Sequence, residues 1–86
     1  MSWDEQAFKE KLEENHNFPG PYIFKFIIRP EYQHQVESLL EGAEIRLKPS
    51  SGNKYLSVTM QKEMASSQEV VDVYKEAYKI EGIISL

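Results

Sequence analysis

Residues 44–61 read EIRLKPSSGNKYLSVTMQ, and in this stretch apolar and polar side chains alternate on both sides of a turn. Ile45 and Leu47 alternate with basic residues before the turn, and every second residue from Leu56 to Met60 is apolar after it. Alternation with a period of two is typical of half-buried strands. Pro49–Asn53 has the composition of a turn. The stretch therefore predicts an antiparallel β-hairpin.

The segment before the hairpin predicts a strand followed by a helix. Tyr22–Ile28 is rich in aromatic and β-branched residues, which favour strands. Arg29 and Pro30 open the helix, because proline suits a first helical turn, and Gly42 is expected to end it. The inward stripe of this helix has the spacing i, i+4, i+7, i+8 and consists of Tyr32, Val36, Leu39 and Leu40.

The segment after the hairpin predicts a second helix and a short strand. Ser66 and Glu69 have the spacing of a capping box, which marks a helix start. One arc of the following helix is apolar and the opposite arc is charged. The apolar arc consists of Val70, Val71, Val73, Tyr74, Ala77 and Tyr78. Gly82 separates this helix from a last strand, Ile83–Leu86.

The N-terminal residues predict a further helix with few apolar contacts. Ser2 and Glu5 form another capping-box pattern, and the apolar stripe of the helix is limited to Phe8 and Leu12. Asn17–Pro21 is rich in structure-breaking residues. We therefore expect residues 1–16 to be a helical appendage and residues 17–86 to be the domain.

The order β-α-β-β-α-β predicts a ferredoxin-like α+β sandwich with an extra N-terminal helix. Right-handed crossovers put both helices on one face of an antiparallel sheet, with the first and third strands in its middle. Phe24 and Phe26 then face the helices. The open face is expected to carry Ile23, Lys25, Ile27, Arg46, Lys48, Tyr55, Ser57 and Thr59.

Composition excludes several classes of function. The chain of 86 residues contains no cysteine, so it has no disulfide and no thiolate site. His16 and His34 are too far apart to suggest a metal site. Nucleophile-elbow and phosphate-loop fingerprints are missing. The acidic N-terminus does not resemble a secretory signal, and no apolar run approaches the roughly 20 residues that span a bilayer. We therefore expect a cytoplasmic, non-catalytic protein without cofactor, metal or membrane contact.

Charge is distributed unevenly along the chain. The net charge is −4, which argues against nucleic acid as the main partner. Between Glu44 and Lys62, however, one acid stands against four bases, giving +3. The hairpin is thus the basic part of an acidic protein.

Several of these segments resemble the YbeD-like family of small, functionally uncharacterised bacterial proteins. The resemblance rests on Phe18-Pro19, the strand Tyr22–Phe26, the run Lys48–Thr59 and the helix around Tyr74. It covers about residues 18–86. It implies a ferredoxin-like fold similar to the ACT regulatory domains that sense amino acids, and it supplies no catalytic residue.

These observations predict a small regulatory or protein-interaction module, with ACT-like ligand sensing as one form of it. An open sheet face with apolar residues favours a protein partner or self-association. The hairpin adds cations and hydroxyls that could hold a small anionic ligand. The candidate binding residues are Lys48, Ser50, Ser51, Lys54 and Tyr55. The competing interpretation is that lysines flanking a hairpin turn keep it soluble and protect its edge.

RNA binding on the open face is the first alternative. RNA-recognition domains share this topology and stack bases on aromatic residues of the central strands. Tyr55 could serve in this way, whereas Phe24 and Phe26 could do so only if the sheet faced the other way.

An acylphosphatase-like hydrolase is the second alternative. Such enzymes use an arginine after the first strand together with an asparagine, and Arg29 and Asn53 are the residues available for these roles. Pro30 removes a backbone donor and Glu31 adds a negative charge where an anion would bind, which argues against this activity.

Overall fold

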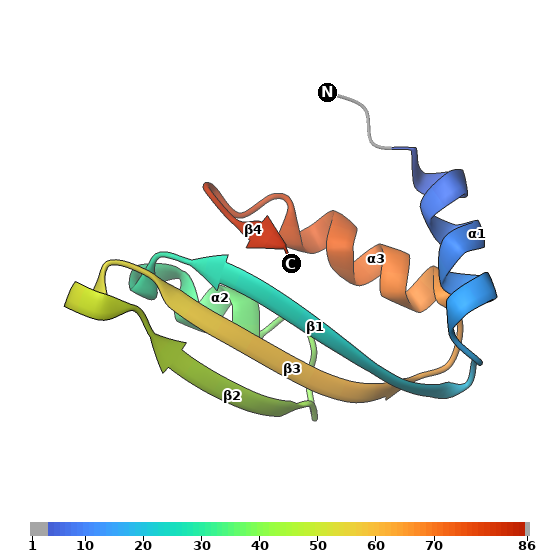
Figure 1. Cartoon of the computed structure of the whole chain (residues 1–86), viewed down its shortest axis with the longest axis horizontal. Helices are drawn as coiled ribbons and strands as arrows, with labels where there is room; N and C mark the ends of the chain where they lie inside the picture. The colour runs from blue at the N-terminus through green and yellow to red at the C-terminus, as the bar shows by residue number, and fades with distance from the viewer. Residues whose placement is uncertain (1–3, 86) are drawn as a thin grey trace.

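The predicted hairpin forms, and the rest of the sheet is built around it (Figure 1). The structure is a computed structural model that describes residues 4–85. Its elements are α1 (Glu5–Asn15), β1 (Gly20–Ile28), η1 (Pro30–Tyr32), α2 (Gln33–Glu37), β2 (Glu44–Pro49), η2 (Ser51–Asn53), β3 (Leu56–Met64), α3 (Ser67–Ala77) and β4 (Ile84–Ser85).

The strands form an antiparallel sheet in the order β2-β3-β1-β4. β1 pairs with β3 along its whole length, with Phe24 opposite Met60 and Phe26 opposite Val58. Directly opposed residues of antiparallel strands point to the same face. The sheet order confirms that the first and third strands of the domain are central.

Both domain helices cover the face that carries the phenylalanines. Phe24 and Phe26 are fully buried, and they share one core with Val36 of α2 and Val70 of α3. In Figure 1, α2 lies behind the sheet and α3 runs along β1. This arrangement is an α+β fold compatible with the ferredoxin-like sandwich, with α1 added at the N-terminus.

The first domain helix is shorter than predicted. The segment begins with the 3₁₀ turn η1, continues as five residues of α2 and ends in turns before Gly42, which has a φ of +79°. Val36 and Leu40 are buried as expected, while Tyr32 and Leu39 are partly buried. The stripe was therefore predicted correctly, although the helical hydrogen bonding ends early.

Two apolar residues are more exposed than predicted. Tyr78 is 47% exposed, and its ring lies 6.1 Å from that of Tyr74. Leu47 lies on the edge strand β2 and is also exposed. The last strand is shorter than predicted, since it covers Ile84–Ser85; Leu86 lies outside the described residues.

α3 begins at the predicted cap. The hydroxyl of Ser66 accepts a hydrogen bond from the backbone N–H of Glu69 at 3.3 Å. The carboxylate of Glu69 accepts one from the backbone N–H of Ala65 at 2.9 Å, one residue before the cap. The two reciprocal bonds of a capping box are therefore present with a shift of one position.

α1 packs on α3 through a small contact. Asp4 caps it by accepting a hydrogen bond from the backbone N–H of Ala7; the predicted Ser2 cap lies outside the described residues. Leu12 is only 4% exposed and belongs to the core, and the ring of Phe8 meets that of Tyr74 edge-on at 5.3 Å. The narrow stripe therefore contacts α3 directly.

Burial raises the pKa of the Tyr74 hydroxyl above its ordinary value of 10, and the hydrogen bond to Tyr22 at 3.2 Å raises it further. A pKa that is higher in the folded chain favours folding below the unfolded value, and that contribution is lost as pH rises. We expect the unfolding free energy to fall over a pH range that begins at about 10, the pKa of tyrosine in the unfolded chain, and extends upward. Denaturant titrations across this range should show a weaker fall for Tyr74→Phe, and equal pH dependence would contradict the assignment.

Candidate functional site

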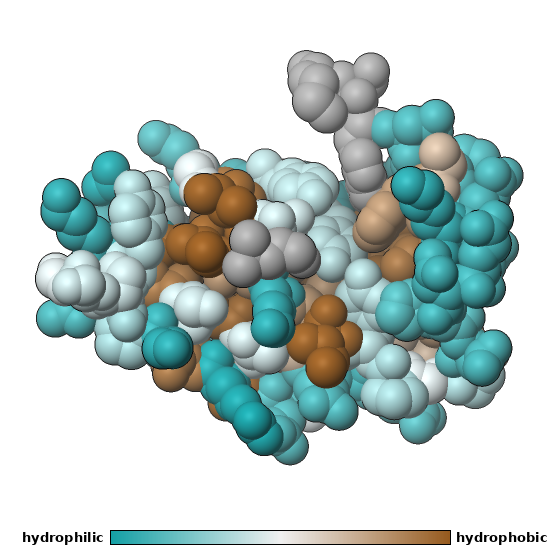
Figure 2. Space-filling model, viewed as in Figure 1, coloured by the Kyte–Doolittle hydropathy of each residue, from teal (hydrophilic) through white to brown (hydrophobic). Residues whose placement is uncertain are grey.

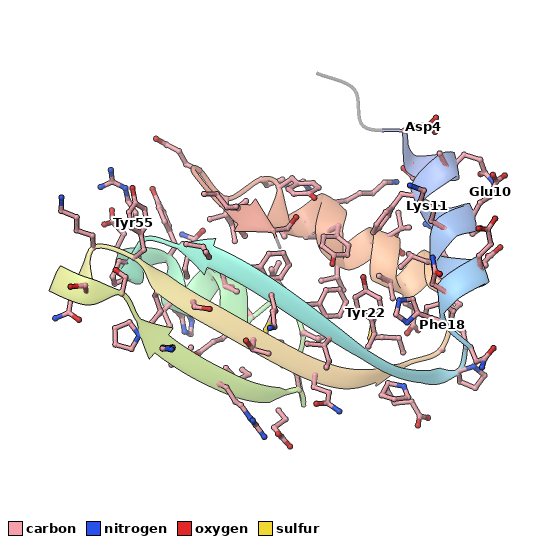
Figure 3. All side chains as sticks on the ribbon, in the orientation of Figure 1. Asp4, Glu10, Lys11, Phe18, Tyr22 and Tyr55 are labelled. Atoms are coloured by element: carbon pink, nitrogen blue, oxygen red, sulfur yellow. The ribbon has the colours of Figure 1, made fainter. Side chains whose placement is uncertain are left out.

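The open face of the sheet ends at the hairpin turn, where Tyr55 precedes β3. Tyr55 is 46% exposed. Figure 3 shows it at the hairpin end of the sheet, far from Tyr22 and Phe18 at the opposite end. Figure 2 shows hydrophobic side chains reaching the surface over the sheet, whereas hydrophilic side chains cover α1. The hairpin end thus presents an aromatic ring beside exposed strand residues.

The turn holds Tyr55 through backbone and hydroxyl hydrogen bonds. The N–H of Ser50 donates to the carbonyl of Tyr55, and the hydroxyl of Ser50 accepts from the N–H of Tyr55, both at 2.9 Å. Gly52 and Asn53 have positive φ values of 77° and 56°, which these residue types tolerate better than others. Serine, glycine and asparagine in this order therefore place the ring and the flanking lysines.

A first hollow lies on the sheet side of Tyr55 and has a volume of about 280 Å³. Its walls are mainly apolar, with one cation, two serine hydroxyls and the tyrosine. The lining residues are Ile27, Lys48, Pro49, Ser50, Tyr55 and Ser57. We call it the sheet hollow.

A second hollow borders Tyr55 as well and has a volume of about 310 Å³. It is lined by Arg29, Lys54 and Tyr55, and we call it the cationic hollow. Ile28 pairs with Leu56 across β1 and β3, so the residues that follow Ile28 and precede Leu56 come together at this end of the sheet. This register explains why Arg29 meets a ring 26 positions away in the sequence.

The cations of both hollows lack acidic partners. Within residues 4–85, the ion pairs are Arg46–Glu44, Lys75–Glu5 and Lys79–Glu76. Arg29, Lys48 and Lys54 therefore have no carboxylate within 4.0 Å in the described part of the chain. No acidic residue lines either hollow. The hairpin end of the open face is consequently a site of unneutralised positive charge.

The other half of the open face differs in its charge. A hollow of about 300 Å³ is lined there by Ile23, Lys25, Glu44, Arg46, Thr59 and Gln61. Arg46 is already paired with Glu44 at 3.3 Å. This half therefore offers a matched control for substitutions at the hairpin end.

The structure brings most of the predicted binding residues together. Lys48 and Ser50 share the sheet hollow with Tyr55, and Lys54 shares the cationic hollow with it. Ser51 is exposed in η2 and lines neither hollow. Ile27 and Arg29 also line the hollows and were not among the predicted binding residues, although pairing Tyr22–Ile28 with the strand after the hairpin would have placed both near Tyr55.

The opposite end of the molecule holds a larger hollow of about 390 Å³, between the end of α1 and the start of α3. The hydroxyl of Ser67 donates to the carboxylate of Glu13 there at 2.6 Å, which links the two helices. His16 lines the same hollow, and its ring lies 4.9 Å from that of Tyr22. The serine hydroxyl bonds the carboxylate and not the imidazole, so this cluster serves helix packing.

Other site types lack support among residues 4–85. The structure contains no group of three His, Cys, Asp or Glu side chains there that could hold a metal ion. Asn53 does not line the hollow that contains Arg29. No described helix is both long and apolar enough to cross a bilayer.

Comparison with known proteins gives one match. A family model described as "Protein of unknown function (DUF493)" matches residues 13–86. It thus covers the whole sheet, both domain helices and the end of α1. No curated protein and no solved structure matches the chain.

Proposed function

The chain belongs to the DUF493 family, and from this premise we propose that it is a non-catalytic regulatory or protein-interaction module. In this proposal the open sheet face binds an acidic surface of a partner protein. The finer grouping with the YbeD-like bacterial proteins, and a cytoplasmic location, are part of the same proposal. The grouping is supported by the sequence resemblance of the run Lys48–Thr59.

The observation that carries the proposal is the separation of charge between the two layers. The helices carry most of the acids, with Glu5, Glu10, Glu13 and Glu14 in α1 and Glu69, Asp72 and Glu76 in α3. The hairpin end of the open face carries three cations without ion pairs. Complementary charge steers association and selects partners. An acidic protein is therefore attracted to the sheet side and repelled from the helix side.

Charge also favours a different protein over a second copy on this face. Two copies that met through this end of the sheet would bring the unpaired cations of one copy, Arg29, Lys48 and Lys54, near those of the other. Like charges across an interface oppose binding. Self-association would then need another surface.

RNA binding remains the second candidate function, and Tyr55 is the observation in its favour. An exposed ring beside cations is the usual arrangement for stacking a base. Phe24 and Phe26 are fully buried, however, so Tyr55 is the one aromatic that the described residues offer on this face. RNA-recognition sheets normally stack two or three bases.

Reversing two hairpin charges should weaken partner binding without unfolding the domain. Lys48→Glu/Lys54→Glu should change the unfolding free energy by less than about 1 kcal/mol, because exposed charges contribute little to stability. The same change should weaken binding to an acidic partner about tenfold or more and reduce its salt dependence. The partner is first identified by affinity capture with the wild-type chain and then titrated at low and moderate salt.

The matched control is Lys9→Glu/Lys11→Glu on α1, which changes the net charge by the same amount away from the sheet face. Weakening by the hairpin variant alone supports the proposal. Equal weakening by both variants would show that only total charge matters. If neither variant weakens binding, the hairpin is not part of the binding surface.

A further inference from the structure

Tyr55 lines both the sheet hollow and the cationic hollow, which differ in chemistry. It lines the sheet hollow together with apolar side chains, and it lines the cationic hollow together with Arg29 and Lys54. We propose that the two hollows form one site for a small ligand that joins a phosphate to a flat ring, as in a mononucleotide. This inference rests on the proposed function, because it assigns a regulatory ligand to the same face.

The sheet hollow suits the flat ring of such a ligand. Ile27 and Pro49 line the sheet hollow together with Tyr55 and provide apolar contact. Every nucleobase has a flat face that stacks on an aromatic side chain, and one such stack is worth about 1–3 kcal/mol. The hydroxyl of Ser50 accepts a hydrogen bond from the backbone N–H of Tyr55, so its own proton is free to be donated to a polar atom of the ligand.

The cationic hollow suits the phosphate. A phosphate monoester carries about −1.5 to −2 charges at neutral pH. Arg29 can donate two parallel hydrogen bonds to phosphate oxygens, and Lys54 adds a point charge. Lys48 lines the sheet hollow that also contains Tyr55, and none of the three cations has an ion pair among the described residues. This excess of positive charge favours a dianionic phosphate over a singly charged carboxylate.

Volume limits the ligand to a small one. The hollows measure about 280 Å³ and 310 Å³, near the lower end of the range of about 300–1,000 Å³ for small-molecule sites. One ring and one phosphate fit two adjacent hollows of this size. The polar hollow further along the sheet contains Glu44, which would repel a second phosphate.

Occupancy of this site would regulate the proposed interaction. A bound phosphate places negative charge over the cations that attract the acidic partner. The ligand and the partner would therefore compete for the same surface, and a rise in ligand concentration would release the partner.

The test uses AMP, adenosine and inorganic phosphate, each titrated into the isotope-labelled full chain and followed by amide NMR. AMP should shift the amide signals of Ile27 and Ser57. It should also bind about tenfold or more tightly than adenosine or inorganic phosphate, because adenosine lacks the charge-assisted contact and phosphate lacks the stacked ring. Tyr55→Ala should weaken the binding of AMP about fivefold or more. Arg29→Gln should weaken the binding of AMP and leave the affinity for adenosine unchanged.

The control is Arg46→Gln, which removes a cation that already has a partner on the same face and should leave AMP affinity unchanged. Tyr55→Phe keeps the ring and should retain binding if Tyr55→Ala proves too unstable to measure. AMP binding no tighter than that of phosphate, or no tighter than that of adenosine, would overturn the two-part site. So would an oligoadenylate that binds about tenfold more tightly than AMP and shifts Ile23 and Lys25, because that would indicate an RNA strand along the sheet.

AMP binding and partner binding are measured separately, so the two proposals can fail independently. Absence of AMP binding alongside partner binding that depends on Lys48 and Lys54 would overturn the nucleotide site and leave the interaction module intact. AMP binding without any partner whose binding depends on these charges would overturn the interaction module and leave the nucleotide site intact.

Discussion

Tyr74→Ala should lower the unfolding free energy by about 3–5 kcal/mol. Tyr74 is 5% exposed and lies at the centre of an aromatic cluster, with its ring centroid 5.3 Å from those of Phe8 and Phe24 and 5.8 Å from that of Phe26. Removing the ring leaves a cavity where α1, α3 and β1 meet. Since small domains are stable by only about 5–15 kcal/mol, this variant would be close to unfolding. Urea denaturation followed by circular dichroism measures the loss.

Tyr74→Phe is the matched control for this prediction. It keeps the ring and removes the hydroxyl that bonds Tyr22 at 3.2 Å. One such hydrogen bond contributes about 0.5–1.5 kcal/mol, so the loss should be much smaller than for alanine. A loss below about 1 kcal/mol for Tyr74→Ala would contradict the assignment of this face of α3 to the core.

The sequence predicted the sheet well because its strands have clear alternation. Apolar and polar side chains alternate strictly from Leu56 to Met60. In Tyr22–Ile28 the two faces differ in polarity only at Lys25. Burying Phe24 and Phe26 leaves this lysine in water, so a single charge decided which face is open. The structure confirms this choice, since both phenylalanines are fully buried.

Features set by tertiary packing were predicted less well. The stripe from Tyr32 to Leu40 has helical spacing, but spacing alone does not show that only Gln33–Glu37 is α-helical. Tyr78 also has the spacing of the core face, and its backbone N–H donates to the carbonyl of Tyr74, yet its side chain is half exposed. The apolar pattern gives the face of a helix on which a side chain lies, but it does not give where the hydrogen bonding ends or how far the core extends along that helix.

The candidate site was predicted in part for the same reason. Lys48, Ser50, Lys54 and Tyr55 are close in sequence, and the turn chemistry of Pro49–Asn53 indicated that they would cluster. Arg29 joins them only through the pairing of β1 with β3. Local composition therefore found the hairpin side of the site, and strand register supplies the other side.

α1 shows how a short stripe can still reach a core. Phe8 and Leu12 are only one helical turn apart, and this spacing indicated weak docking. Tyr74 of α3 nevertheless meets the ring of Phe8 edge-on, and Leu12 is only 4% exposed within the core. The remaining links are the Glu13–Ser67 hydrogen bond and the partly exposed Glu5–Lys75 ion pair at 2.8 Å.

A chain shortened to residues 17–86 should still fold cooperatively, with its unfolding free energy lowered by a few kcal/mol. Burial of an apolar side chain contributes about 1.5–3 kcal/mol, and α1 contributes Leu12 in full and Phe8 in part. The Glu5–Lys75 pair adds little because both side chains are partly exposed. All strand pairs, α2 and α3 remain in the shortened chain. Comparison with Leu12→Ala in the full chain, by urea denaturation, separates the buried leucine from the rest of the helix. A shortened chain that is unfolded at 25 °C would show that the domain cannot fold without α1.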